Sequence, residues 1–252
     1  MTAYNRRAAL SVLGLGSLGL LAACGSSNSE STAAASSEAS TSAASSNSAS
    51  ASASTSASAS ASASASASAN QSPLPNDDKN YSGVAKLEKF DNHGEYQAAN
   101  AEHPAQNVPT PVLPDSMHQN SVAGFASALA YFSAAVDYLL KTGDMEYLRK
   151  VSTNTETLNA LQKYADRTKE GIDQKKTWYA NPTATLTIKS AQPVLASGAY
   201  NWSVDFVIDL GEKLFANGKE QETPKDKRYV NMTGEAVGRY VNNIWDLQMD
   251  VN

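Results

Sequence analysis

The sequence predicts an α+β domain in which N-terminal helices pack on one face of an antiparallel sheet. From residue 122 onward, apolar residues first recur at every third or fourth position, which is typical of helices. Beyond residue 178 they alternate with polar residues, which is typical of strands with one buried face. Of the 3 Trp, 11 Tyr and 5 Phe, only Tyr4 precedes residue 80, so we expect the core in the later part of the chain.

The longest predicted helix follows Pro114. Asp115 or Ser116 is its expected N-cap, and Gly143 is expected to end it in the left-handed conformation. One apolar stripe runs along this helix and consists of Val122, Phe125, Leu129, Phe132, Val136 and Leu139.

Two further helices are expected after Gly143. Asp144 caps a short one whose inward residues are Met145, Leu148 and Val151. The next runs from about Thr155 to around Lys175, with an apolar face made of Leu158, Leu161, Tyr164 and Ala165.

The strands follow in the order of the chain. Residues 184–189 and 202–210 alternate between apolar and polar, and Asn217-Gly218 is typical of a hairpin turn. We predict two more strands, near 228–232 and 236–240. Asn242-Asn243 then turns the chain into a last strand, 244–249, with Trp245 and Leu247 on one face.

The N-terminus has the features of an export signal. Arg6 and Arg7 precede an apolar run that ends in Leu21-Ala22-Ala23-Cys24, followed by Gly25. This tetrapeptide resembles a bacterial lipobox. The resemblance implies a signal peptide over residues 1–23, cleavage by a signal peptidase, and attachment of lipid to Cys24 by an acyltransferase. Several acyl chains, such as palmitate, would make the membrane attachment stable.

The export route stays open between two alternatives. The stretch from Asn5 to Leu10 resembles a twin-arginine signal. Ala9, however, stands where that signal usually has an aromatic residue, and an arginine pair is also ordinary in general secretory signals.

A low-complexity stalk follows Cys24, so residues 24–72 comprise the lipidated Cys and a disordered Ser/Ala-rich stretch. Of the 48 residues from Gly25 to Ser72, 38 are Ser or Ala, and alanine methyl groups bury too little apolar area to offset the loss of chain entropy. As a flexible coil the stalk spans roughly 35–42 Å. The alternatives are an O-glycosylated stalk and silk-like strand pairing.

Residues 73–114 form a Pro-rich linker that we expect to be extended. The three histidines, His93, His103 and His118, lie in it or just beyond it. Their spacing matches no metal motif, so we interpret them as solvated loop residues.

The order of helices and strands looks like the cone-shaped fold of nuclear-transport-factor-2-like (SnoaL-like) proteins, in which the sheet is curved. A closer resemblance covers residues 105–160, where the stretch from Ala105 to Pro114 leads into Asn120-Ser121, Gly124-Phe125 and Thr142-Gly143-Asp144. This is similar to an uncharacterised family of actinobacterial lipoproteins. The resemblance implies a cone-like domain over residues 115–252.

The composition excludes several classes of function. One Cys leaves no disulfide framework and no cysteine-based zinc site. A net charge of −5 without a clustered basic stripe argues against nucleic-acid binding. No phosphate-binding Gly-rich loop or nucleophile elbow is present, and Gly234 and Gly238 only coincide with a GxxxG spacing. The sequence therefore predicts no cofactor, no metal and no catalytic residue.

Three groups of polar or aromatic residues are candidate sites. Asp205 and Asp209 share one strand face, roughly 13 Å apart, and are expected to be solvated. Asp137 beside Tyr131 and Tyr138 allows an acid–phenol pair, although packing at the helix rim is the favoured interpretation. The remaining pair, Trp202 and Trp245, is expected in the core rather than in a ligand pocket.

These observations predict an extracytoplasmic lipoprotein of a Gram-positive actinobacterium, held on the outer face of the cell membrane through Cys24. Its stalk would present a small binding domain to an unknown protein or small apolar ligand. Two alternatives stay open, namely a cone-fold isomerase-like or dehydratase-like enzyme and a structural cell-wall protein with a glycosylated stalk.

Overall fold

The structure is a computed structural model that describes Leu74 and residues 77–252, and these belong to one compact unit. The predicted signal peptide, Cys24 and the Ser/Ala stalk lie outside the described residues. The predicted fold class is confirmed in its main terms, because the described chain is α+β with antiparallel sheets.

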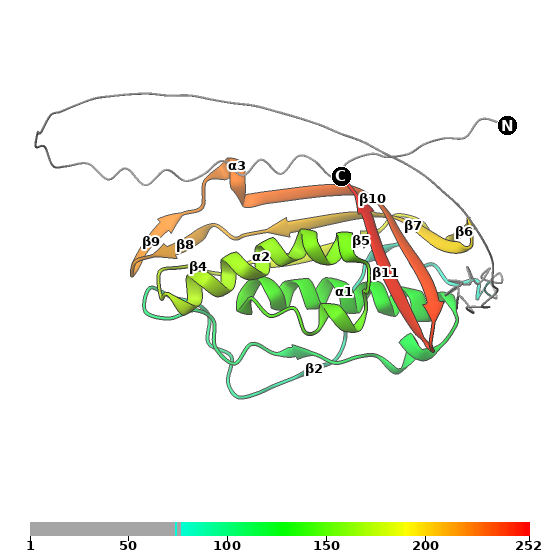
Figure 1. Ribbon diagram of the computed structural model, residues 1–252, viewed down its shortest axis with the longest axis horizontal. Coiled ribbons are helices and arrows are strands. Elements are labelled where there is room, and N and C mark those ends of the chain that lie inside the picture. Colours follow the sequence, from blue (N-terminus) through cyan, green and yellow to red (C-terminus); the bar gives the residue numbers. More distant parts are fainter. Residues whose placement is uncertain (1–73, 75–76) are drawn as a thin grey trace, which may run out of the picture. The chain divides into compact units, whose positions relative to one another are not determined.

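The main sheet has six antiparallel strands in the order β1-β5-β7-β10-β11, and the short β6 pairs with the first part of β7 (Figure 1). Its strands are β1 (Gly83–Val84), β5 (Thr183–Ile188), β6 (Val194–Ala196), β7 (Ala199–Asp209), β10 (Tyr229–Val241) and β11 (Ile244–Val251).

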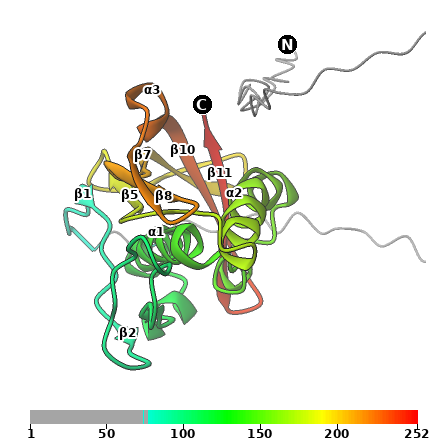
Figure 2. The same cartoon turned by 90° about the vertical axis from the view of Figure 1, so that its left-hand side faces the viewer.

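Both long helices lie on the same side of this sheet, α1 (Val122–Thr142) against it and α2 (Thr155–Asp173) beside α1 (Figure 2). By length and composition α1 is able to cross a membrane, yet 67% of its most apolar window is buried inside the domain. Its apolar character is therefore explained by the core that it builds.

The helices agree with the predictions from the sequence, with two exceptions. Gly143 has a φ of 76° and caps α1 as predicted. The predicted N-cap at Asp115 or Ser116 is wrong, because residues 115–118 form a separate 3-10 turn and the Ser121 hydroxyl accepts from Gly124 N at 3.0 Å instead. The predicted second helix is only the 3-10 turn Leu148–Lys150.

The strands β5, β7 and β11 and the turn at Asn242-Asn243 are confirmed, and both asparagines have positive φ. The two strands predicted near 228–232 and 236–240 are wrong, since they form the single strand β10. Gly234 does not break this strand. A Cβ on Gly234 would lie 2.1 Å from the Asp250 carbonyl oxygen, so the glycine permits a close approach of β11.

A second, three-stranded sheet has the order β4-β8-β9. The predicted turn at Asn217-Gly218 joins β8 and β9, while β4 and β6 have three residues each and carry too little pattern to be predicted. The strands of this second sheet are β4 (Thr177–Tyr179), β8 (Lys213–Ala216) and β9 (Lys219–Glu222). After β9, the short helix α3 (Lys225–Arg228) leads into β10.

Residues 77–114 contact both the main sheet and the second sheet. Strand β1 pairs with β5, and the rings of Tyr81 and Trp202 pack edge-on with their centroids 5.9 Å apart. Two shorter pieces, β2 (Phe90–Asp91) and β3 (Thr110–Pro111), pair with each other. Ala99 packs with Trp178 and Phe215 in a small second core against β4 and β8.

Candidate functional site

The space between α1 and the main sheet is occupied by an aromatic stack centred on Phe125. This ring stacks on Trp245 with centroids 4.9 Å apart and lies 5.3 Å from Trp202. Both tryptophans are fully buried, and their indole N–H groups donate to the carbonyls of Ser190 and Gln119 at 2.9 Å. The prediction that Trp202 and Trp245 are core residues is confirmed.

Two glycines make room for this stack. A Cβ on Gly238 would lie 2.5 Å from the Phe125 ring, and one on Gly124 would lie 2.8 Å from the Trp245 indole nitrogen. Gly238 faces the Phe125 ring whereas Gly234 faces the backbone of β11, so the two glycines of the GxxxG spacing serve different contacts. No sequence pattern predicts that Gly238 makes room for Phe125, because this role depends on which ring faces β10.

Asp137 does not form an acid–phenol pair. Its carboxylate accepts from the Lys141 ammonium group and from Ala184 N, the latter at 3.3 Å. The Ser133 hydroxyl donates to the carbonyl of the same Ala184 at 3.2 Å. These two side chains of α1 thus satisfy backbone groups of β5, which gives Asp137 a structural role.

The tyrosines of α1 have different surroundings. Tyr138 packs edge-on against Tyr147 with centroids 5.0 Å apart, as expected for the helix rim. Tyr131 is fully buried, and its hydroxyl has no hydrogen-bond partner among the described residues. Burial raises the pKa of Tyr131, so its hydroxyl stays protonated over the physiological range.

The two carboxylates of β7 lie on the face of the sheet that the helices leave open, as predicted. Asp205 accepts from Lys189 Nζ and from the Thr233 hydroxyl, both at 2.8 Å. These hydrogen bonds, that of Lys189 foremost, hold the pKa of Asp205 below its ordinary value.

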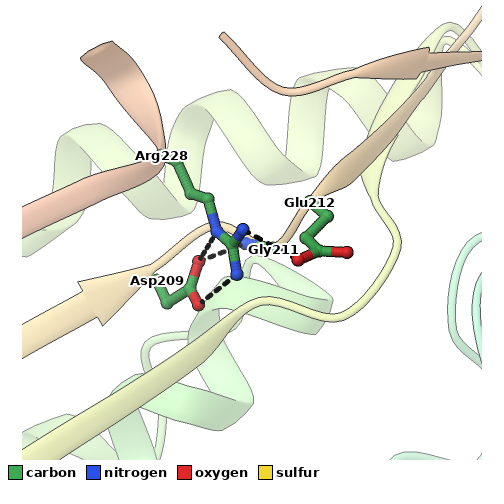
Figure 3. A network of polar contacts seen from close by, with 4 residues as sticks. All are labelled: Asp209, Gly211, Glu212 and Arg228. Carbon is green, nitrogen blue, oxygen red and sulfur yellow. Dashed lines mark hydrogen bonds and ion pairs between the residues drawn. The ribbon is translucent and has the colours of Figure 1, made fainter. Parts of the chain in front are cut away.

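Asp209 belongs to a separate network with Arg228 and Glu212 (Figure 3). The Arg228 guanidinium donates to both carboxylate oxygens, at 2.9 and 3.1 Å, and Gly211 N donates at 2.8 Å. The hydrogen bonds from Arg228 hold the pKa of Asp209 below its ordinary value. Asp205 and Asp209 therefore belong to separate ion pairs and do not converge on a shared site.

Comparison with known proteins identifies the family of this chain. Residues 94–251 match the model of a family of unknown function, DUF6318. The chain belongs to this family. No curated protein and no solved structure matches it.

The DUF6318 match begins inside the segment predicted to be a linker and ends with the last strand, β11. It therefore covers the aromatic stack, the tyrosines of α1 and both carboxylates of β7. The resemblance to an uncharacterised domain is confirmed at this level.

Each histidine of the DUF6318 chain contacts a polar oxygen of the domain. His93 Nε2 lies 3.0 Å from the Thr110 hydroxyl, His103 Nδ1 lies 2.8 Å from the Pro104 carbonyl, and His118 Nδ1 lies 3.0 Å from the Asn243 carbonyl. Within residues 77–252, no group of three His, Cys, Asp or Glu side chains is placed to hold a metal ion.

Proposed function

We propose that this DUF6318 protein is a lipoprotein anchored to the outer face of the cell membrane of a Gram-positive actinobacterium. The observation that carries the proposal is the sequence Leu21-Ala22-Ala23-Cys24, placed directly after an apolar run that begins behind Arg6-Arg7. Cys24 is the sole cysteine of the chain, so lipid attachment as a thioether has one possible position.

The described domain acts in this proposal as a binding module on a Ser/Ala stalk. This role is supported by the contacts that the aromatic and acidic side chains make within the domain. Phe125, Trp202 and Trp245 fill the interior beside α1, whereas Asp137, Asp205 and Asp209 are engaged by neighbouring residues. Recognition of a partner is therefore assigned to the surface of the domain.

We also propose that the fold is a relative of the nuclear-transport-factor-2-like cone. Two features support this relationship: α1 lies against one face of the main sheet, and the sheet is antiparallel with β11 at its edge. In the enzymes among such folds, Tyr, Asp or His side chains project into the cone. Here aromatic rings fill the space between α1 and the sheet, which favours a role at the surface of the domain.

The anchor is tested by growing an actinobacterial host that expresses the full chain with an alkyne-labelled fatty acid. The unaltered chain is expected to take up label and to sediment with membranes. Cys24→Ser should lose the label and leave the membrane fraction, because serine offers no thiol for the thioether.

Ser27→Ala is the matched control, since it changes a neighbouring residue outside the tetrapeptide, and it should behave like the unaltered chain. Label that persists in Cys24→Ser, or an unlabelled chain in the soluble fraction of the unaltered strain, would contradict the proposal.

A further inference from the structure

Four exposed basic residues belong to the C-terminal half of α2, to the turn that follows it and to β9. We call this group the basic corner, and its members are Arg167, Lys175, Lys176 and Lys219. The chain as a whole carries a net charge of −5, so this corner opposes the overall charge of the protein.

The backbone brings these residues together from two distant segments. Asn217 N, in the turn between β8 and β9, donates to the Lys176 carbonyl at 2.6 Å. Gly171, in the last turn of α2, lets β4 approach closely, because a Cβ there would lie 2.2 Å from the Thr177 carbonyl oxygen. The end of α2 and the tip of the β8–β9 hairpin are thus fixed against each other.

The pairing of the strands places Lys219 on the same face as this helix end. Lys219 pairs with Ala216 and Ala216 with Thr177, and residues in such a row share one face of a sheet. Glu220 belongs to the next row with Phe215 and Trp178, so its carboxylate lies on the opposite face. There it pairs with Lys213 Nζ at 2.7 Å.

The acids of the same helix end are engaged elsewhere. Asp173 pairs with Lys169 at 3.2 Å, and Glu170 accepts from Gln174 Nε2 at 2.8 Å. Within the described chain, Arg167, Lys175 and Lys219 have no ion-pair partner, and the Lys176 ammonium group donates only to the Gln174 side-chain oxygen at 2.8 Å. The corner therefore holds four cations that form no ion pair within the described chain.

Favourable interaction with the helix dipole does not account for this cluster. Cations at the C-terminal end of a helix are stabilising within the last turn, but the last turn of α2 holds no basic residue, and Lys175 and Lys176 follow its C-cap Gln174. Lys175 has a φ of 53°, in the left-handed region where a helix end usually has glycine. Lys219 comes from a different element, and the dipole gives no reason for it.

The corner also lies far from the point where the described chain begins. The Tyr200 hydroxyl is hydrogen-bonded to the backbone of Leu74, beside the β6–β7 hairpin. Figure 1 shows β6 at one end of the domain and β8 and β9 at the other. A domain tethered through Leu74 thus presents the basic corner at its far end.

We propose that the basic corner binds a polyanion that carries closely spaced phosphate groups. The inference names a partner for the binding role proposed above and rests on that role. Phosphate is a suitable anion because three of the four cations are lysines, which bind phosphate as compact point charges, and the fourth is an arginine, whose fork also fits phosphate.

The test measures binding of the purified full chain to fluorescently labelled polyphosphate by anisotropy at 50 mM salt and higher. The unaltered chain is expected to bind, with an affinity that falls as salt rises, as for other cation–polyphosphate contacts. The variant R167Q/K175Q/K176Q/K219Q should bind at least ten-fold more weakly.

The matched control is K86Q/K89Q/K225Q/R239Q, which removes the same number of exposed lysines and arginines elsewhere. It should keep its affinity within about three-fold, because a local contact depends on position while a general charge effect does not. Near-ultraviolet circular dichroism of the buried tryptophans should show that both variants keep the native fold.

Three results would overturn the inference: no binding of polyphosphate at 50 mM salt, equal weakening in both variants, or equal binding of poly-glutamate, whose anions are carboxylates. The assay contains no membrane, so its failure would leave the anchor at Cys24 standing. Loss of the anchor in the labelling experiment would likewise leave this result untouched.

Discussion

Ser152 and Leu247 are joined by a buried hydrogen bond that closes the open edge of the main sheet. The Ser152 hydroxyl donates to the Leu247 carbonyl at 2.6 Å, and Leu247 N in turn donates to the Val151 carbonyl at 2.9 Å. Farther along β11, Met249 N donates to the Thr157 hydroxyl at 3.1 Å. The connection between α1 and α2 thereby occupies an edge at which another strand would otherwise pair.

Ser152→Ala is expected to lower the free energy of unfolding by about 1–3 kcal/mol, because it leaves the buried Leu247 carbonyl without its side-chain donor. Urea unfolding followed by tryptophan fluorescence measures the change. Ser203→Ala, on the exposed face of β7, is the control and should stay within about 0.5 kcal/mol of the unaltered chain. Equal effects in both variants would contradict the importance of the edge contact.

Gly238→Ala is expected to destabilise the domain by about 1–3 kcal/mol, since the new methyl group would overlap the Phe125 ring. The double variant Gly238→Ala/Phe125→Leu tests the cause. If the ring is the obstacle, the two changes together should cost less than the sum of their separate effects in urea unfolding. Strict additivity would show that the glycine is needed for another reason.

Asp209→Asn is expected to cost about 1 kcal/mol at neutral pH, because the Arg228 and Asp209 side chains are 23% and 25% exposed and solvent screens the pair. The pKa of Asp209 is lowered in the folded state, so the ion pair stabilises the fold above the ordinary value of 3.8. This stabilisation is lost as the pH falls below 3.8 through the folded-state pKa.

Unfolding of both chains between pH 7 and pH 3 measures this dependence. The stability gap between the unaltered chain and Asp209→Asn should narrow below about pH 4. Asp226→Asn, which removes the same charge from exposed α3, should show no such gap at neutral pH. A gap that stays constant down to pH 3 would exclude the ion pair as its source.

Tyr131→Phe is expected to leave the free energy of unfolding unchanged or to raise it by up to about 1 kcal/mol, because the hydroxyl that it removes is buried without a described partner. Tyr240→Phe is the control, since its hydroxyl donates to the His118 carbonyl, and it should lose about 1 kcal/mol. Loss of stability in Tyr131→Phe would reveal a partner for the hydroxyl, such as a bound water.

Local chemistry made several elements predictable from the sequence. The stripe from Val122 to Leu139 indicated α1, and Gly143 indicated its end, because only a residue tolerant of positive φ stops a helix in that way. The alternation in β5 and β7 indicated which face of each strand is buried. The same alternation predicted that Asp205 and Asp209 lie on the open face of the sheet.

The arrangement of the polar residues was not predictable, since their partners are distant in the chain. Asp137 had the composition of an acid–phenol site, but the backbone of β5 lies beside it. The basic corner joins α2 to the β8–β9 hairpin across more than forty residues, and no local pattern marks it.

The sequence by itself therefore determined the class of the fold, the C-terminal end of its longest helix and the strands β5, β7 and β11, and it predicts the lipid anchor at Cys24. These features depend on neighbours within a few residues, where periodicity and backbone preference act. The tertiary structure alone decided the roles of Gly238, Ser152 and Arg228. Each depends on contacts with residues farther away in the chain, and these contacts exist only after the strands have taken their register.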